Sequence, residues 1–174
     1  IPAKSSFKLL ALLGQAWAQI AILEENQGPG TKEILISIAQ QLRGFVNEVS
    51  GASKEEIKIV LAFESLIQKK YDEASSLAQS AQWKKSWSEE VEAIRIKIIA
   101  QSEFQIFLRD NDKSEFNLKV ARLRKIHQVV ESIDPRFRTS EFSFLASESY
   151  WHLASTLRVE DPQKYSRESR QALE

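Results

Sequence analysis

The sequence predicts an all-α protein. Only 5 glycines and 4 prolines occur among 174 residues, too few for an all-β chain that turns about every ten residues. Ala, Leu, Glu, Gln, Lys and Ser are abundant, and most of these residues favour helices. Hydrophobic residues make up 43% of the chain, which is enough to form a core. We therefore expect an ordered, helical protein.

Turn-forming residues divide the chain into eight expected helices. Gly supplies positive φ, Asp and Asn accept hydrogen bonds from nearby backbone amides, and the residue before Pro avoids helical geometry. These residues gather at Gly28-Pro29-Gly30, Ser50-Gly51-Ala52-Ser53, Asp110-Asn111-Asp112, Asp134-Pro135 and Asp161-Pro162. The helices between them are expected over residues 5–25, 31–49, 54–69, 71–83, 86–109, 113–132, 139–158 and 162–173. Consecutive helices pair into four hairpins.

Three polar residues carry signals for helix N-termini. Ser53 is followed three residues later by Glu56, the spacing of a capping box, in which two side chains bond the first free amides of a helix. Ser86 and Glu89 repeat that spacing, and Thr31 precedes another predicted helix. We expect N-caps at Thr31, Ser53 and Ser86.

The stretch 57–81 has small and aromatic residues where two short antiparallel helices need them: Leu61, Ala62, Tyr71, Ala74 and Ala81. This pattern resembles one tetratricopeptide (TPR) repeat. In that family a small residue on the first helix and two alanines seven apart on the second let the backbones approach closely. Lys58, Ser65 and Ala78 differ from the aromatic residues that the family often has there.

Residues 54–86 have the repeat length of that family, about 34 residues. The resemblance implies an α-solenoid of about four antiparallel helical hairpins, wound as a right-handed superhelix. Residues 1–174 are expected to form one such TPR-like domain. Because the chain begins with Ile1-Pro2 and contains no Met, we expect it to be a piece of a longer protein.

Repeats of this family usually bind proteins, so the resemblance implies a protein-interaction or scaffolding module. The first helix of the matching repeat would line a concave groove with the apolar residues Ile59, Phe63, Leu66 and Ile67. It lacks the Lys and Asn residues with which some TPR domains grip the acidic C-terminal tails of chaperones. We expect the partner to be an amphipathic helix or peptide, unless another part of the chain fills this groove.

The predicted helix 139–158 has two apolar faces. One face carries Phe142, Leu145, Ala146, Leu153 and Leu157. The opposite side carries Phe144 and Trp151, seven residues apart. Core packing on both sides explains such a helix, and a partner site anchored by Phe144 and Trp151 is the alternative.

Basic and acidic residues both number 24, so no long-range field attracts nucleic acid or an anionic membrane. A local basic cluster comprises Lys119, Arg122, Lys125, Arg136 and Arg138. At 100° per residue the charges of the 119–125 run scatter around a helix, which favours a solvated face. A helical nucleic-acid-binding domain that uses this cluster is the alternative function.

The predicted helix 5–25 is apolar almost all round, with a polar strip at Lys8, Gln15 and Gln19. Its strongly apolar part, residues 9–13, falls short of the about 20 apolar residues that a membrane span needs. We expect a buried helix rather than a signal peptide or a membrane span. Because the ends of solenoids normally carry a polar cap, another helix of the full-length protein or a second copy of the chain is expected to cover it.

No catalytic or cofactor motif is present: the sequence lacks a glycine-rich phosphate loop, a G-x-S-x-G elbow, an H-E-x-x-H pair and a calcium loop. It has no Cys and only 2 His, which leaves little for a zinc site. In the predicted helix 113–132, an apolar stripe comprises Phe116, Val120, Leu123, His127 and Val130. His127 is expected to be buried, neutral and bonded to a backbone carbonyl. We expect no cofactor and no enzyme activity. A regulatory domain of a larger enzyme or ATPase is a third function, and a soluble, cytoplasmic location is slightly favoured.

Overall fold

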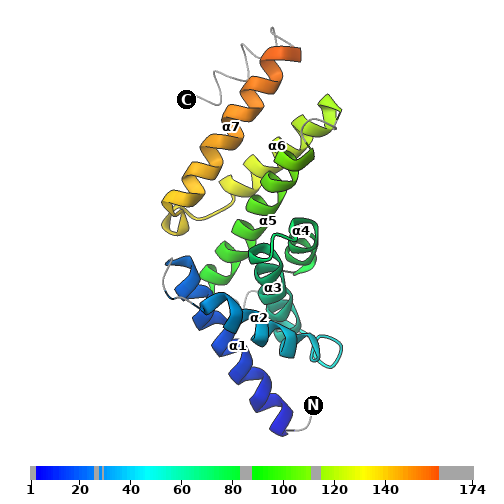
Figure 1. The fold of residues 1–174 in the computed structure, drawn as a ribbon, viewed down its shortest axis with the longest axis vertical. Coiled ribbons are helices and arrows are strands. Elements are labelled where there is room, and N and C mark those ends of the chain that lie inside the picture. Colours follow the sequence, from blue (N-terminus) through cyan, green and yellow to red (C-terminus); the bar gives the residue numbers. More distant parts are fainter. Residues whose placement is uncertain (1–2, 26–27, 29, 83–87, 111–114, 161–174) are drawn as a thin grey trace. The chain divides into compact units, whose positions relative to one another are not determined.

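The computed structural model describes residues 3–25, 28, 30–82, 88–110 and 115–160 (Figure 1). Over these residues it contains seven α-helices, one 3-10 helix and no strand, so the all-α prediction is confirmed. The α-helices are α1 (Ala3–Glu24), α2 (Thr31–Arg43), α3 (Ala52–Ile67), α4 (Tyr71–Ser80), α5 (Glu89–Asp110), α6 (Phe116–Glu131) and α7 (Ser140–Glu160), with the 3-10 helix η1 (Pro135–Phe137) between the last two. The eighth predicted helix, 162–173, lies outside the described residues.

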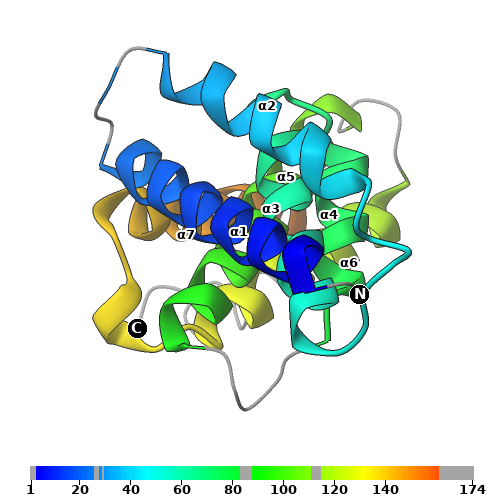
Figure 2. The ribbon, with the colours of Figure 1, turned by 90° about the horizontal axis from the view of Figure 1, so that it is seen from below.

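The chain divides into two compact units, Ile1–Glu92 and Ala93–Glu174. The division falls within the first turn of α5, whereas we expected one domain over residues 1–174. In the first unit α1 pairs with α2, α3 pairs with α4, and α2 also packs against α3 (Figure 2). The helices are therefore arranged as two hairpins in contact through α2 and α3.

Small residues allow close packing of the α3–α4 hairpin. Ala62 of α3 and both Ala74 and Ala78 of α4 have no exposed area. Ala81 is also buried, but α4 ends at Ser80 and Ala81 already has extended backbone angles, φ −73° and ψ 115°. The helix is thus shorter than the predicted span of 71–83.

The turn between α3 and α4 is built on Lys69, which has a positive φ of 61°. The Lys70 amide donates to the Ser65 carbonyl at 2.9 Å, and the Lys69 amide donates to the Leu66 carbonyl at 2.9 Å. This is the Schellman pattern, in which Gly is the usual residue at the left-handed position. Lys69 therefore adopts a conformation that is costly for a residue with a Cβ.

An ion pair between an exposed guanidinium and a buried carboxylate joins the two hairpins of the first unit. Arg43, the last residue of α2, places its guanidinium Nη2 2.7 Å from Oε2 of Glu64 on α3. The Glu64 side chain is only 1% exposed, whereas that of Arg43 is 40% exposed. The amide Nε2 of Gln68 also donates to the Glu64 carboxylate. A carboxylate without solvent is thus held by partners from two helices.

Lys58 joins the start of α3 to the end of α4. Its ammonium lies 2.9 Å from Oε2 of Glu55 and donates to the Ser80 carbonyl at 3.1 Å. Glu55 Oε2 also accepts the Gln82 amide at 2.9 Å. Lys58 therefore belongs to a polar network that links the two ends of the α3–α4 hairpin.

Glycines begin two helices where side-chain caps were expected. Gly30, with φ 84°, precedes α2, and the Thr31 hydroxyl donates to the Gly28 carbonyl at 2.8 Å instead of accepting an amide. Gly51, with φ 67°, precedes α3, so Ser53 lies inside that helix. The N-caps predicted at Thr31 and Ser53 are wrong because glycine tolerates these positive φ values.

Two further boundary predictions have different outcomes. The N-cap expected at Ser86 lies outside the described residues, and Ser88 Oγ accepts the Val91 amide at 3.4 Å just before α5. Helix α2 ends at Arg43, earlier than the predicted residue 49. Gly44, a poor helix former, follows it, and the amides of residues 44–46 bond carbonyls three residues back.

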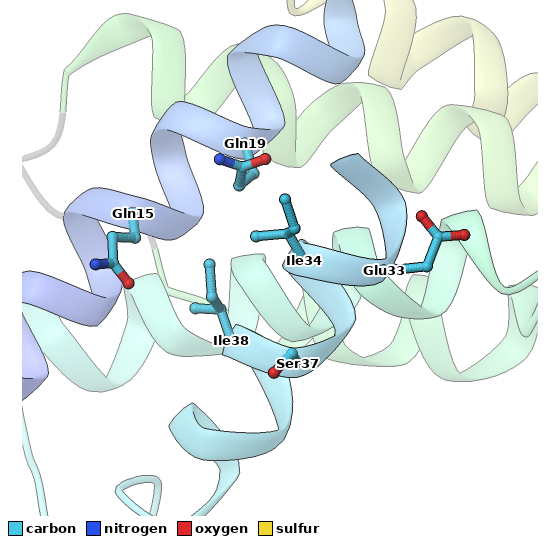
Figure 3. Close-up of a pocket in the computed structure, with 6 residues that line it drawn as sticks. All are labelled: Gln15, Gln19, Glu33, Ile34, Ser37 and Ile38. Carbon is cyan, nitrogen blue, oxygen red and sulfur yellow. The ribbon is translucent and has the colours of Figure 1, made fainter. Parts of the chain in front are cut away.

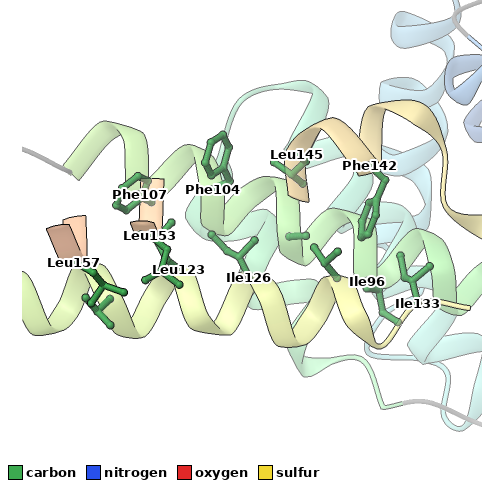
Figure 4. Packing of buried hydrophobic residues seen from close by; sticks show 13 residues of the cluster. Ile96, Phe104, Phe107, Leu123, Ile126, Ile133, Phe142, Leu145, Leu153 and Leu157 are labelled. Atoms are coloured by element: carbon green, nitrogen blue, oxygen red, sulfur yellow. The ribbon is translucent and has the colours of Figure 1, made fainter. Parts of the chain in front are cut away.

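The second unit has a continuous apolar core formed by α5, α6 and α7 (Figure 4). Its buried members are Ile96, Ala100, Phe104 and Phe107 of α5, Val120, Leu123, Ile126 and Val130 of α6, Phe142, Leu145, Leu153 and Leu157 of α7, and Ile133. Phe116 and Ala146 pack against this cluster. The stripe predicted on α6 and the larger apolar face predicted on α7 are therefore both core.

Candidate functional site

The outer face of α7 carries two large apolar side chains in solvent. Phe144 is 66% exposed and Trp151 is 63% exposed, although Leu145 and Leu153 beside them are buried. A spacing of seven residues is two helical turns, so the two rings lie about 10.5 Å apart along the axis. Ser147 stands between them and donates its hydroxyl to the Ser143 carbonyl at 3.0 Å. We call Phe144 and Trp151 the α7 aromatic pair.

Trp151 contacts an aromatic cluster that includes buried core residues. Its ring meets the ring of His152 edge-on, with centroids 4.9 Å apart. The His152 ring in turn contacts Phe107 at 5.2 Å and Phe104 at 5.7 Å. These contacts restrict Trp151 before any partner arrives, which lowers the entropic cost of binding.

The imidazole of His152 adds no strong charge beside Trp151 at neutral pH. Burial lowers the pKa of His152 below its ordinary value of 6.5, and this effect exceeds the opposing effect of the Glu148 carboxylate. A neutral ring supports the apolar character of the site. The α7 aromatic pair is thus a surface for apolar contact rather than for charge recognition.

The groove predicted on α3 is closed where it was expected to be open. Ile59 has no exposed area and Phe63 is 5% exposed, so neither side chain is accessible to a partner in the folded chain. Leu66 and Ile67, at the end of α3, are half-buried. Ile59 and Phe63 are apolar because they belong to the core. The sequence of one helix does not show whether its apolar face is covered by the rest of the chain.

Acidic side chains form ion pairs with several cations of the predicted basic cluster. Glu103 of α5 is 7% exposed and lies 2.9 Å from the ammonium of Lys125 and 3.3 Å from Nε of Arg122. Arg122 also approaches Asp110 at 3.7 Å. One buried carboxylate therefore binds two of the cations that were candidates for nucleic acid.

The remaining cations of the cluster lie in varied surroundings. Arg136 forms an ion pair with Asp134 at 2.7 Å, and the hydrogen bond from the Arg136 side chain lowers the pKa of Asp134 to about 2. Arg138 Nη2 donates to the Glu131 carbonyl at 3.4 Å. Lys119 is half-buried on α6. This arrangement disfavours a phosphate-binding surface.

His127 is buried, as the apolar stripe predicted, and it also stacks on an aromatic ring. Its ring lies 3.8 Å from that of Tyr150, and it forms a hydrogen bond with the backbone of Ser149. Burial lowers the pKa of His127, while that bond and Glu131 act in the opposite direction. Among the residues that the structure describes, no three His, Cys, Asp or Glu side chains converge as a metal site. The burial of His127 and its hydrogen bond to the Ser149 backbone agree with the structural interpretation.

An open hollow of about 570 Å³ lies between α1 and α2 (Figure 3). It is lined by Gln15, Gln19, Glu33, Ile34, Ser37 and Ile38. The amides and the single carboxylate do not form a nucleophile with a base, nor a set of metal ligands. Gln15 and Gln19 belong to the polar strip noted in the sequence, and the hollow offers no evident chemistry.

Three comparisons, with family models, with curated proteins and with solved structures, return no match to this chain.

Proposed function

We propose that the chain is a protein-interaction or scaffolding module that binds a partner helix or peptide on the outer face of α7. The exposure of Phe144 and Trp151 on that face is the observation that carries the proposal. Burying a large apolar side chain contributes about 1.5–3 kcal/mol. Tryptophan is also enriched among the residues that dominate binding energies.

The packing of helical hairpins in the first unit supports the proposal of a repeat protein. In the first unit the α1–α2 hairpin packs on the α3–α4 hairpin through α2 and α3. The fully buried Ala62 and Ala74 lie where a TPR-like repeat needs small residues. We propose that the hairpins belong to a TPR-like α-solenoid.

The partner's chemistry follows from the surroundings of the α7 aromatic pair. A spacing of two turns matches the apolar stripe of an amphipathic helix, which presents side chains at positions i, i+3, i+4 and i+7. Ser147 lies between the rings, the half-buried Glu148 is one turn from each of them, and Arg158 is exposed beyond Trp151. Two charges of opposite sign do not form a dense charged patch, so we expect binding to persist at high salt.

Affinity capture with the whole chain as bait tests this function. Parallel baits are the unaltered chain, the double variant Phe144→Ala/Trp151→Ala, and the control variant Leu118→Ala. Leu118 is 62% exposed on α6, so the control truncates an apolar side chain of similar fractional exposure elsewhere. Captured proteins are identified by mass spectrometry, at low and high salt and after nuclease treatment. Each candidate is then titrated in purified form.

The expected result is a discrete protein that survives high salt and nuclease, binds the control variant and loses at least about tenfold in affinity for the double variant. Unchanged binding by a double variant of native helical content contradicts the α7 site. Capture of nucleic acid that is lost at high salt favours the basic cluster instead.

A further inference from the structure

Helix α1 has an apolar face that the rest of its unit does not cover. Leu9, Leu12 and Leu13 are buried, as are Ala16 and Ile20. Phe7 and Leu10 point the other way, with 75% and 62% of their areas exposed. The expectation of a buried helix is thus met on one face only. The outward face, between Lys8 and Glu24, carries no charged residue.

Five exposed residues of this face follow the spacing of a helix-pairing seam. They are Phe7, Ala11, Gly14, Ala18 and Ala21, separated by intervals of four, three, four and three residues, and the exposed Leu10 and Gln15 flank them. Alternation of three and four is the heptad pattern that keeps one stripe of a helix against a partner helix. The three alanines and Gly14 leave room for a second backbone to approach closely. We call these five residues the α1 seam.

Packing within the chain does not require glycine in this seam. A Cβ added to Gly14 would meet no atom within 4 Å other than those of its own helix turn. Glycine nevertheless weakens a helix relative to alanine. The small residue at position 14 leaves room for a close neighbour from outside the described residues. The small residues alone do not identify that neighbour.

The charges at the two ends of α1 favour one neighbour. Helix α1 has no acidic residue in its first turn and no basic residue in its last turn. The exposed Glu25 instead follows its C-terminal end, where the helix dipole disfavours negative charge, and the exposed Lys8 lies near the opposite end. An antiparallel helix of the same sequence reverses this disadvantage, because it places Lys8 of each copy beside the acidic end of the other.

We propose that α1 mediates antiparallel self-association, with a second copy of this chain as the occupant of the α1 seam. The two-fold axis crosses the α1 seam at the height of residue 16 along the helix. Gly14 of one copy then lies opposite Ala18 of the other, and Ala11 lies opposite Ala21. Phe7 then packs beside the Glu25 end, with Lys8 available to the carboxylates there. A parallel pair would instead bring like charges together at both ends.

A bilayer is the main competing occupant. By length and composition alone, residues Ser6–Glu24 could cross a membrane, with a mean hydropathy of 1.4 and 28% of the stretch buried. A signal sequence or a core helix meets the same criterion. Insertion would pull the buried leucines of α1 out of the first unit. An anionic membrane surface is also disfavoured, because binding there needs a basic polar face and α1 ends in two glutamates.

One helix face per copy is a small interface, so we expect a reversible equilibrium between monomer and dimer. Sedimentation equilibrium of the whole chain over a wide concentration range measures it. Ala18→Glu places two uncompensated charges in each dimer and should raise the dissociation constant at least about 100-fold. Ser76→Glu, at an exposed position of α4, is the matched control and should leave it unchanged.

A charge exchange tests the antiparallel orientation. Lys8→Glu and Glu25→Lys should each weaken the dimer roughly 5–10-fold, because two symmetric contacts change at once. The double variant Lys8→Glu/Glu25→Lys should restore the association. Circular dichroism verifies that every variant retains the native helical content.

Three results overturn the proposal. The first is a monomer at every concentration, and the second is an association that Ala18→Glu leaves unchanged. The third is a pair of charge variants whose effects add in the double variant instead of cancelling. Binding of the unaltered chain to phosphatidylcholine vesicles, lost in Ala18→Glu while the protein in solution stays monomeric, assigns α1 to membranes instead.

Discussion

Replacing Arg43 with Met should destabilise the fold more than replacing its partner Glu64 with Gln. In Arg43→Met the carboxylate of Glu64, 1% exposed, loses a cation at 2.7 Å. Stranding a buried charge costs about 3–5 kcal/mol. The Gln68 amide still donates to that carboxylate, and the exposed surroundings of Arg43 admit water, so we expect a loss below that range, about 2–3 kcal/mol.

The loss of stability should be smaller in Glu64→Gln, because the charge left without its partner is the exposed Arg43 guanidinium. In Glu64→Gln the neutral amide leaves no buried charge and retains one acceptor oxygen. The Arg43 guanidinium, 40% exposed, turns to water. We expect a loss of about 1 kcal/mol. The double variant Arg43→Met/Glu64→Gln should lose less than the sum of the two single losses.

Urea unfolding at pH 7, followed by circular dichroism, measures these free energies. Lys32→Met, on the exposed side of α2, is the matched control and should change stability by less than about 0.5 kcal/mol. The ranking should persist in 0.5 M salt if the pair is buried. A loss for Arg43→Met no larger than that for Glu64→Gln refutes the reasoning, as does strict additivity in the double variant.

Three further predictions concern single positions. Lys69→Gly should raise the free energy of unfolding by about 0.5–1 kcal/mol, since Gly relieves the positive φ of 61° but makes the unfolded chain more flexible; a destabilised variant in urea unfolding contradicts the Schellman geometry. Ala74→Leu should cost about 1–3 kcal/mol by overpacking a site with no exposed area, and an unchanged melting temperature contradicts the close α3–α4 packing. Burial lowers the pKa of His127 in the folded chain, so the unfolded chain binds more protons below its pKa of 6.5. Stability should therefore fall as the pH drops through 6.5, and His127→Gln should weaken that dependence; equal slopes for the two proteins between pH 7.5 and 5.5 argue against a role for His127.

Local patterns in the sequence determined the helical class and the approximate places of the seven described α-helices. Pro135 and the glycines near 28–30 and 51 marked turns correctly, because their backbone preferences act without distant partners. The periodic stripes of α6 and α7 identified core faces, and His127 was assigned to the core for the same reason. Caps were less predictable, since Gly30 and Gly51 took the places expected of polar side chains.

The tertiary structure decided which apolar faces are covered and which charges are paired. Ile59 and Phe63 are four residues apart and Phe144 and Trp151 are seven apart, and both spacings place the two residues on one face of a helix, yet the first pair is buried and the second is exposed. Glu103 meets Arg122 and Lys125 from about twenty residues away in the chain, so the sequence pattern of α6 showed cations without their partner. Burial and ion pairing depend on neighbours that are distant in sequence, whereas helix formation depends mainly on residues within one turn.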